Sequence, residues 1–75
     1  MIKREQHYFS FNGGKNAAQK LSTVKKKLIS MGAAITISDY KSDTGECRIG
    51  FTIHPEDCVK VFVYIDTLED YRIYM

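Results

Sequence analysis

Residues 7–32 read HYFSFNGGKNAAQKLSTVKKKLISMG and contain the two patterns that decide the fold. The aromatic run at 7–11 ends at an Asn-Gly-Gly turn, which is typical of a short strand. From Ala17 to Met31, apolar residues recur at intervals of four and three, which predicts an amphipathic helix. Gly32 follows directly, where we expect the helix to stop in a left-handed conformation. The domain is therefore expected to open with a strand and a helix.

Beyond this helix the apolar residues alternate with polar ones, which favours strands. Alternation runs through 35–40, 47–53 and 59–65. A turn at Gly45, which suits a left-handed position, separates the first two stretches, and a turn at Pro55 separates the last two. The pattern predicts two successive hairpins.

The whole chain, residues 1–75, is expected to form a single α+β domain of order β-α-β-β-β. One amphipathic helix packs on one face of a four-stranded mixed sheet. The tail at 67–75 forms either a short C-terminal strand or a helical turn, and its composition favours the extended form. The patterns leave open whether the first strand lies beside the second or the fourth. Alternate residues of a strand face the same side of the sheet, so the apolar residues of neighbouring strands must be opposite one another. The expected core-facing pairs are Ile35 with Ile53, Ile37 with Phe51, and Ile53 with Val59.

Length and composition exclude several classes of protein. The chain has 75 residues, of which 44% are hydrophobic and 27% charged, values that fit one small globular domain. No apolar run approaches the roughly 18 residues of a membrane helix, and the N-terminus lacks the apolar core of a signal peptide. The predicted hairpin separates Cys47 from Cys58 by roughly 20 Å, too far for a disulfide. Free thiols indicate a cytoplasmic protein.

The face of the predicted sheet away from the helix is expected to be exposed. Contiguous exposed aromatic residues mark interaction sites, so this face predicts a dimer interface or a platform that stacks bases. The alternative is that Phe62 lies over Gly50 within the sheet and that the tail covers the rest. Alternation places these aromatic and basic side chains on the face: Tyr8, Tyr40, Arg48, Phe62 and Tyr64.

The helix carries a basic surface. Residues 1–30 hold seven basic and one acidic side chain, a net charge of +6, whereas residues 31–75 hold four and eight, a net charge of −4. Such a helix either contacts phosphates or is a solvated surface on which lysine stems cover apolar groups. The net charge of only +2 is low for a dedicated nucleic-acid binder. The candidate phosphate contacts are Lys20, Lys25, Lys26 and Lys27.

A third surface is acidic and lies at the end of the sheet opposite the Pro55 turn. Its carboxylates come from three separate segments and would face the basic groove of another protein, or hold a hard divalent ion. The alternative is that turns prefer Asp and that acids favour solubility. The residues are Asp39, Asp43, Glu46, Asp66, Glu69 and Asp70.

Two short motifs carry residue types that are suited to chemistry. Backbone amides at 12–15 lie where a helix would cradle a phosphate, but the Walker pattern is absent, so a plain strand-to-helix turn is favoured. Residues 54–58, His-Pro-Glu-Asp-Cys, would supply metal ligands or a Cys-His pair only if His7 or a second subunit completed the set. We interpret His54 as a turn residue and expect no catalytic residue, metal or cofactor.

The leading hypothesis is a small non-enzymatic domain that binds a protein. Compact domains of this kind are typical of phage and mobile-element inhibitors. Its acidic surface would mimic nucleic acid and block a nucleic-acid-binding host protein or a defence complex. The alternative is a nucleic-acid-binding module that uses the lysine helix and the aromatic sheet face. A third hypothesis is a small ribonuclease toxin that uses His7 or His54 with Arg48. A homodimer through the sheet face is expected under either binding hypothesis.

Overall fold

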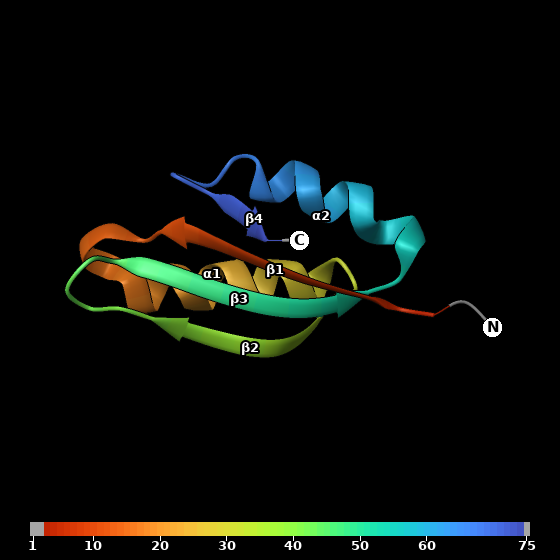
Figure 1. Ribbon diagram of the computed structural model, residues 1–75, viewed down its shortest axis with the longest axis horizontal. Helices are drawn as coiled ribbons and strands as arrows, with labels where there is room; N and C mark the ends of the chain where they lie inside the picture. Colours follow the sequence, from red (N-terminus) through yellow and green to blue (C-terminus); the bar gives the residue numbers. More distant parts are fainter. Residues whose placement is uncertain (1–2, 75) are drawn as a thin grey trace.

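The computed structural model describes residues 3–74 and contains one four-stranded sheet with two helices (Figure 1). The elements are β1 (Glu5–Asn12), a 3-10 turn (Gly14–Asn16), α1 (Ala17–Ser30), β2 (Ala34–Tyr40), β3 (Glu46–Ile53), a 3-10 turn (Pro55–Asp57), α2 (Cys58–Ile65) and β4 (Arg72–Tyr74). The strand order is β2-β3-β1-β4, and all neighbours are antiparallel. Two β-α-β units are therefore interleaved, which is the split β-α-β, or ferredoxin-like, topology. The predicted α+β class is confirmed.

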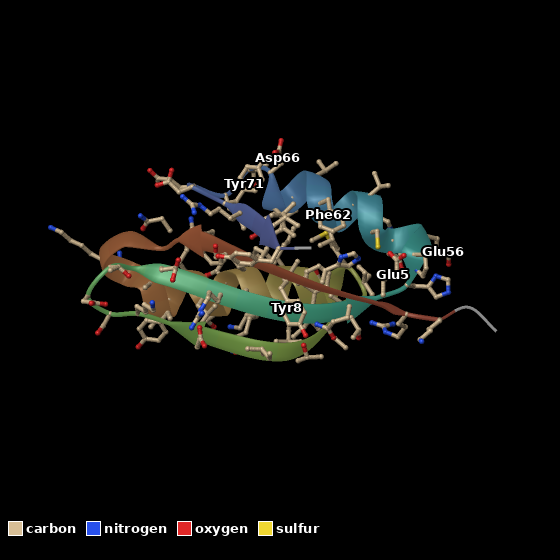
Figure 2. All side chains as sticks on the ribbon, in the orientation of Figure 1. Glu5, Tyr8, Glu56, Phe62, Asp66 and Tyr71 are labelled. Atoms are coloured by element: carbon tan, nitrogen blue, oxygen red, sulfur yellow. The ribbon has the colours of Figure 1, made fainter. Side chains whose placement is uncertain are left out.

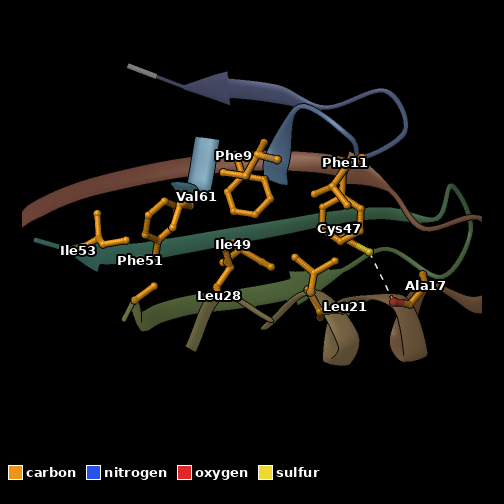
Figure 3. Packing of buried hydrophobic residues seen from close by; sticks show 14 residues of the cluster. Phe9, Phe11, Ala17, Leu21, Leu28, Cys47, Ile49, Phe51, Ile53 and Val61 are labelled. Carbon is orange, nitrogen blue, oxygen red and sulfur yellow. Dashed lines mark hydrogen bonds between the residues drawn. The ribbon is translucent and has the colours of Figure 1, made fainter. Parts of the chain in front are cut away.

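The core lies between the sheet and the two helices, which pack on the same face. Alternate residues of β1 and β3 point into it, and Figure 3 shows Phe9, Ile49 and Phe51 meeting Leu28 of α1 and Val61 of α2. Packing aromatic rings against aliphatic side chains in this way supplies most of the stability of a small domain. The fully buried side chains are Phe9, Phe11, Val24, Leu28, Cys47, Ile49, Phe51, Ile53, Val61 and Ile65.

Several local predictions are confirmed. The helix at Ala17–Ser30 buries the expected apolar stripe, and the tail ends in a short strand, β4. Gly32 and Gly45 both adopt the left-handed conformation, with φ of 97° and 78°. The place of the first strand is not among these, because β1 lies between β3 and β4 and so is beside neither the second strand nor the segment 59–65.

The prediction of a strand at 59–65 is wrong, because Cys58–Ile65 forms α2. Alternating apolar residues there also fit a helix whose buried positions are one turn apart, Val61 and Ile65. Pro55 at the start of the preceding 3-10 turn, followed by two acids, is a helix-start signal. β1 takes the place beside β3 that the predicted hairpin would have filled. The crossover to β4, which runs parallel to β3, then requires a helix.

Two further details of the predicted sheet are wrong. The sheet is antiparallel throughout rather than mixed, since each helix connects strands that are separated by a third strand. In the β2–β3 hairpin Ile35 opposes Phe51 and Ile37 opposes Gly50, with a bulge between them. The extra residue turns Ile37 to the face away from the helices, where its side chain is half exposed.

Within residues 3–74, no helix combines the length and apolar character that crossing a membrane requires. Cys47 and Cys58 are both free thiols, the first buried and the second partly buried. The buried thiol of Cys47 donates a weak hydrogen bond to the carbonyl of Ala17, at 3.5 Å (Figure 3). Cys47 therefore belongs to the packing of the core.

Candidate functional site

Helix α2 exposes two apolar side chains that are not part of the hydrophobic core. Val61 and Ile65 are completely buried, whereas Val59 is 72% and Val63 is 63% exposed. Because Val59 and Val63 are four residues apart, they lie one above the other on the same flank of the helix. An eight-residue helix that exposes two adjacent valines is suited to contact another apolar surface.

This flank continues into a shallow hollow between α2 and the end of the chain. Phe62 borders the hollow from α2, and Tyr71 and Ile73 border it from the β4 side. Figure 2 shows Phe62 and Tyr71 on neighbouring parts of this region. We call Val59, Phe62, Val63, Tyr71 and Ile73 the α2–β4 surface. β4 is the last strand of the sheet, so no further strand of the described chain covers this side.

A polar cluster lies at the other end of α2. Glu5 and His7 are alternate residues of β1 and point to the helix side of the sheet, where they meet Cys58, the first residue of α2. The Cys58 thiol donates to Glu5 Oε1 at 3.0 Å, and His7 Nε2 lies 3.4 Å from the same oxygen. Cys58 Sγ and His7 Nε2 are 3.7 Å apart. Glu5 is seen beside the first turn of α2 in Figure 2. We call these residues the Glu5–His7–Cys58 cluster.

The electrostatics of the cluster do not produce a reactive thiolate. Burial and, next, the hydrogen bond to the Glu5 carboxylate raise the pKa of the Cys58 thiol to about 11. The same hydrogen bond, together with one from His7, lowers the pKa of Glu5 below its usual value. A nucleophilic cysteine needs a nearby positive charge that lowers its pKa. The arrangement therefore does not resemble a Cys-His nucleophile.

The face of the sheet away from the helices is open and has two distinct rows. The aligned residues of the first row are Ile37, Gly50, Tyr8 and Tyr74, and those of the second row are Asp39, Arg48, Ser10 and Arg72. The Tyr8 ring lies over Gly50, where an added Cβ would come within 2.9 Å of it. Tyr8 and Tyr74 are nearly half exposed. We call these two rows the open sheet face.

Only part of the predicted sheet face lies on the open sheet face. Tyr8 and Arg48 are there, and Tyr8 rather than Phe62 covers Gly50. Tyr40 opposes Cys47 and so belongs to the helix side of the edge strand β2. Phe62 and Tyr64 lie on α2 and are partly buried, because their segment is helical. The predicted aromatic row across the sheet is therefore wrong.

The lysines of α1 lie on the layer opposite the open sheet face. Lys20, Lys26 and Lys27 are exposed on α1, and Lys25 reaches Ser38 at the edge strand, with Nζ to Oγ at 3.4 Å. The sheet stands between these lysines and Tyr8, so one short nucleic-acid strand cannot contact both without passing around an edge.

The predicted acidic residues gather only in part. The β2–β3 turn and the α2–β4 loop approach the same end of the sheet in Figure 1, and they bring Asp43, Glu46, Glu69 and Asp70 to it. A second hollow lies at this end of the sheet. Lys41 and Arg72 line it together with Glu46 and Asp70, and Lys41 Nζ lies 3.8 Å from Glu46 Oε1. The other two acids each contact a partner of their own. Asp39 pairs with Arg48 on the open sheet face, and Asp66 accepts a hydrogen bond from Tyr71.

The amides of the 12–15 motif have structural partners of their own, whereas the 54–58 motif is divided between a turn and the Glu5–His7–Cys58 cluster. The Gly13 amide donates to Gly45 O and the Gly14 amide donates to Asn12 Oδ1, both at 2.7 Å, so these amides are not free to hold an anion. His54 precedes the 3-10 turn, and its Nδ1 lies 3.5 Å from Glu56. His7 and Arg48 lie on opposite faces of the sheet, and His54 follows the end of β3, about 20 Å along the strand from Arg48. Neither histidine of the ribonuclease hypothesis therefore converges with Arg48.

No protein-family model, curated protein or solved structure matches this chain. Function must therefore be argued from the surfaces themselves, since the fold alone does not specify one. Nothing in the sequence singles out Glu5, because it is one isolated acid near the N-terminus and belongs to no motif. Sequence reasoning also missed Val59 and Val63, which it assigned to the core.

Proposed function

We propose that the chain is a small protein-binding domain rather than an enzyme and that it binds through the α2–β4 surface. The observation that carries the proposal is the exposure of Val59 and Val63 beside Phe62 and Ile73. Apolar residues that gather on the surface of a small domain mark contacts with other proteins. The high thiol pKa of Cys58 argues against one kind of enzyme only, a cysteine nucleophile at this cluster.

The partner that we propose for this surface is a second copy of the chain. A two-fold axis beside α2 would place each Val59 against the Val63 of the other copy, because the two residues are one helical turn apart. Such self-complementarity requires no other protein of matching shape. A chain of 75 residues also buries a limited core, so a dimer would add to its stability.

A partner with a basic groove remains a prediction from the sequence. It is not placed on the acidic end in this proposal, because Lys41 and Arg72 share that end and Asp39 is already paired. The inhibitor role of the phage or mobile-element type belongs to the same prediction. The free thiols fit a reducing compartment, which we propose is the cytoplasm.

Sedimentation equilibrium over a dilution series tests the dimer. The wild type is expected at twice the chain mass of 8.6 kDa, and Val59→Lys with Val63→Lys at the mass of one chain. Ile29→Lys is the matched control, because Ile29 is an isolated apolar residue of α1, 57% exposed. A wild type that stays monomeric, or a double lysine variant that remains dimeric, would contradict the proposal. Circular dichroism confirms that each variant is folded.

A second candidate function is the binding of single-stranded nucleic acid on the open sheet face. Tyr8 and Tyr74 are directly opposite each other on β1 and β4, and Arg48 and Arg72 belong to the adjacent row. Exposed aromatic rings beside arginines on a sheet are suited to stack bases and contact phosphates. This observation favours the nucleic-acid alternative in a form that uses the sheet without the lysine helix.

Fluorescence anisotropy of a labelled single-stranded oligonucleotide tests this candidate. Binding should weaken steeply as salt is raised, and Tyr8→Ala with Tyr74→Ala should weaken it at least tenfold, about 1–3 kcal/mol for each stacked base. Tyr40→Ala is the control, since Tyr40 is similarly exposed but lies on the helix side. Equal loss in the control, or no binding at low salt, would remove this candidate.

A further inference from the structure

We propose that Glu5, His7 and Cys58 bind a single zinc ion or a similar transition-metal dication. The donors come from β1 and from the first residue of α2, which the split topology brings together. The proposal goes beyond the protein-binding role and does not depend on it, because the cluster and the α2–β4 surface have no side chain in common. The two are neighbours, since His7 packs against Phe62 and Cys58 borders the same hollow.

Two of the three distances between the donor atoms match a tetrahedral metal site. The triangle of Cys58 Sγ, Glu5 Oε1 and His7 Nε2 has sides of 3.0, 3.4 and 3.7 Å. Zinc bonds these atoms at about 2.0–2.3 Å, so two ligands at a tetrahedral angle lie about 3.3–3.6 Å apart. Two sides therefore fit within about 0.1 Å, and only the sulfur–oxygen side must lengthen, by about half an ångström.

Packing holds two of the ligands in place. The His7 imidazole packs edge-on against Phe62, with ring centroids 5.0 Å apart, and lies 5.7 Å from Phe51. These contacts orient the ring while its Nε2 faces the Cys58 thiol and the Glu5 carboxylate. Cys58 is fixed in the first turn of a helix. Ligands that are held on a strand and a helix lose little freedom when they bind a metal.

The donor set selects the class of metal. A thiolate, an imidazole and a carboxylate suit zinc or cobalt, whereas magnesium and calcium prefer oxygen ligands alone. When the sulfur–metal bond forms, the Cys58 proton leaves to the solvent. The thiolate and the Glu5 carboxylate then balance the two positive charges of the ion. Three protein ligands leave a fourth position for a water molecule.

The neighbouring turn offers matched control residues. His54 and Glu56 are a histidine and a glutamate near the start of α2, but they face each other at 3.5 Å and are not among the three donors. If zinc binding were an unspecific property of acids and histidines at this end of the molecule, these residues would contribute to it as much as Glu5 and His7.

Cobalt titration of the full, chelator-treated chain tests the site, because a cobalt–thiolate bond gives a near-ultraviolet charge-transfer band. We expect one equivalent of Co²⁺ to bind per chain, to be displaced by Zn²⁺, and to be unaffected by excess Mg²⁺. Cys58→Ser should abolish the band, and Glu5→Gln should weaken binding at least tenfold. Glu5 is an exposed residue, so this second variant is expected to remain folded.

The outcomes separate this proposal from its alternatives. His54→Gln and Glu56→Gln should bind cobalt like the wild type, and a tenfold loss in either would overturn the ligand set. Absence of the charge-transfer band in the wild type, or an unchanged band in Cys58→Ser, would overturn the site. The spectra do not depend on oligomeric mass, so failure here is distinguishable from failure of the dimer.

Discussion

Replacing single valines of α2 with alanine tests the assignment of this segment most sharply. Val61 is fully buried, so Val61→Ala removes two buried carbons, worth about 0.8 kcal/mol each, and leaves a small cavity. Val63 is 63% exposed, so most of its side chain is already in water. Alanine favours a helix by about 0.5 kcal/mol over valine, and this gain applies equally to both variants. We expect Val61→Ala to cost about 1.5–2.5 kcal/mol and Val63→Ala less than about 0.5 kcal/mol.

Urea unfolding followed by circular dichroism measures the difference. With an m-value of roughly 1 kcal/mol/M for so small a domain, the midpoint of Val61→Ala should fall by about 1.5–2.5 M, and that of Val63→Ala hardly at all. The measurement is repeated at two protein concentrations, because a loss that reflects dimer dissociation depends on concentration. Equal losses for Val61→Ala and Val63→Ala at high dilution would refute the helical assignment, since a strand with period two would bury both.

Two further predictions concern titration. In metal-free protein, alkylation of Cys58 should be slow at neutral pH and accelerate about tenfold for each pH unit up to about pH 11, because the raised pKa keeps the thiol protonated. Glu5→Gln should speed the alkylation of Cys58, because it removes the charged acceptor of the thiol hydrogen bond. Mass spectrometry distinguishes Cys58 from buried Cys47. Equal alkylation rates in the variant and the wild type would contradict the role of Glu5. The hydrogen bond to Asp66 raises the pKa of Tyr71, so Asp66→Asn should lower it. An ultraviolet titration that is identical in both proteins would refute that contact.

The first part of the fold could be predicted from the sequence, because its signals are local. The helix of Ala17–Ser30 has a periodicity that no strand shares. Gly32 follows α1 and Gly45 precedes β3, both with positive φ. The segment Cys58–Ile65 could not be assigned in this way, since its apolar residues fit both periods. This segment is helical because β1 already pairs with β3 at the position that a strand there would need. That pairing joins segments far apart in the sequence, so local patterns do not reveal it.

The residues that form the candidate sites depend on the pairing of β1 with β3, because this pairing makes the segment Cys58–Ile65 helical. His7 and Cys58 were both noticed in the sequence as candidates for chemistry, but Glu5 joins them only because α2 crosses above the start of β1. In the predicted hairpin Val59 and Val63 would have been core residues, and the helix instead exposes them. Sequence alternation therefore placed Val61 and Ile65 correctly in the core but assigned Val59 and Val63 to the wrong surface.

Isotope-filtered nuclear Overhauser spectroscopy shows whether the α2–β4 surface binds a second copy of the chain. A mixture of labelled and unlabelled chains reports only contacts between copies. We expect the methyl groups of Val59 and Val63 to contact each other, and Phe62, across the two copies. Contacts between copies that involve only Tyr8, Ile37 and Tyr74 would place the interface on the open sheet face instead and would contradict the claim.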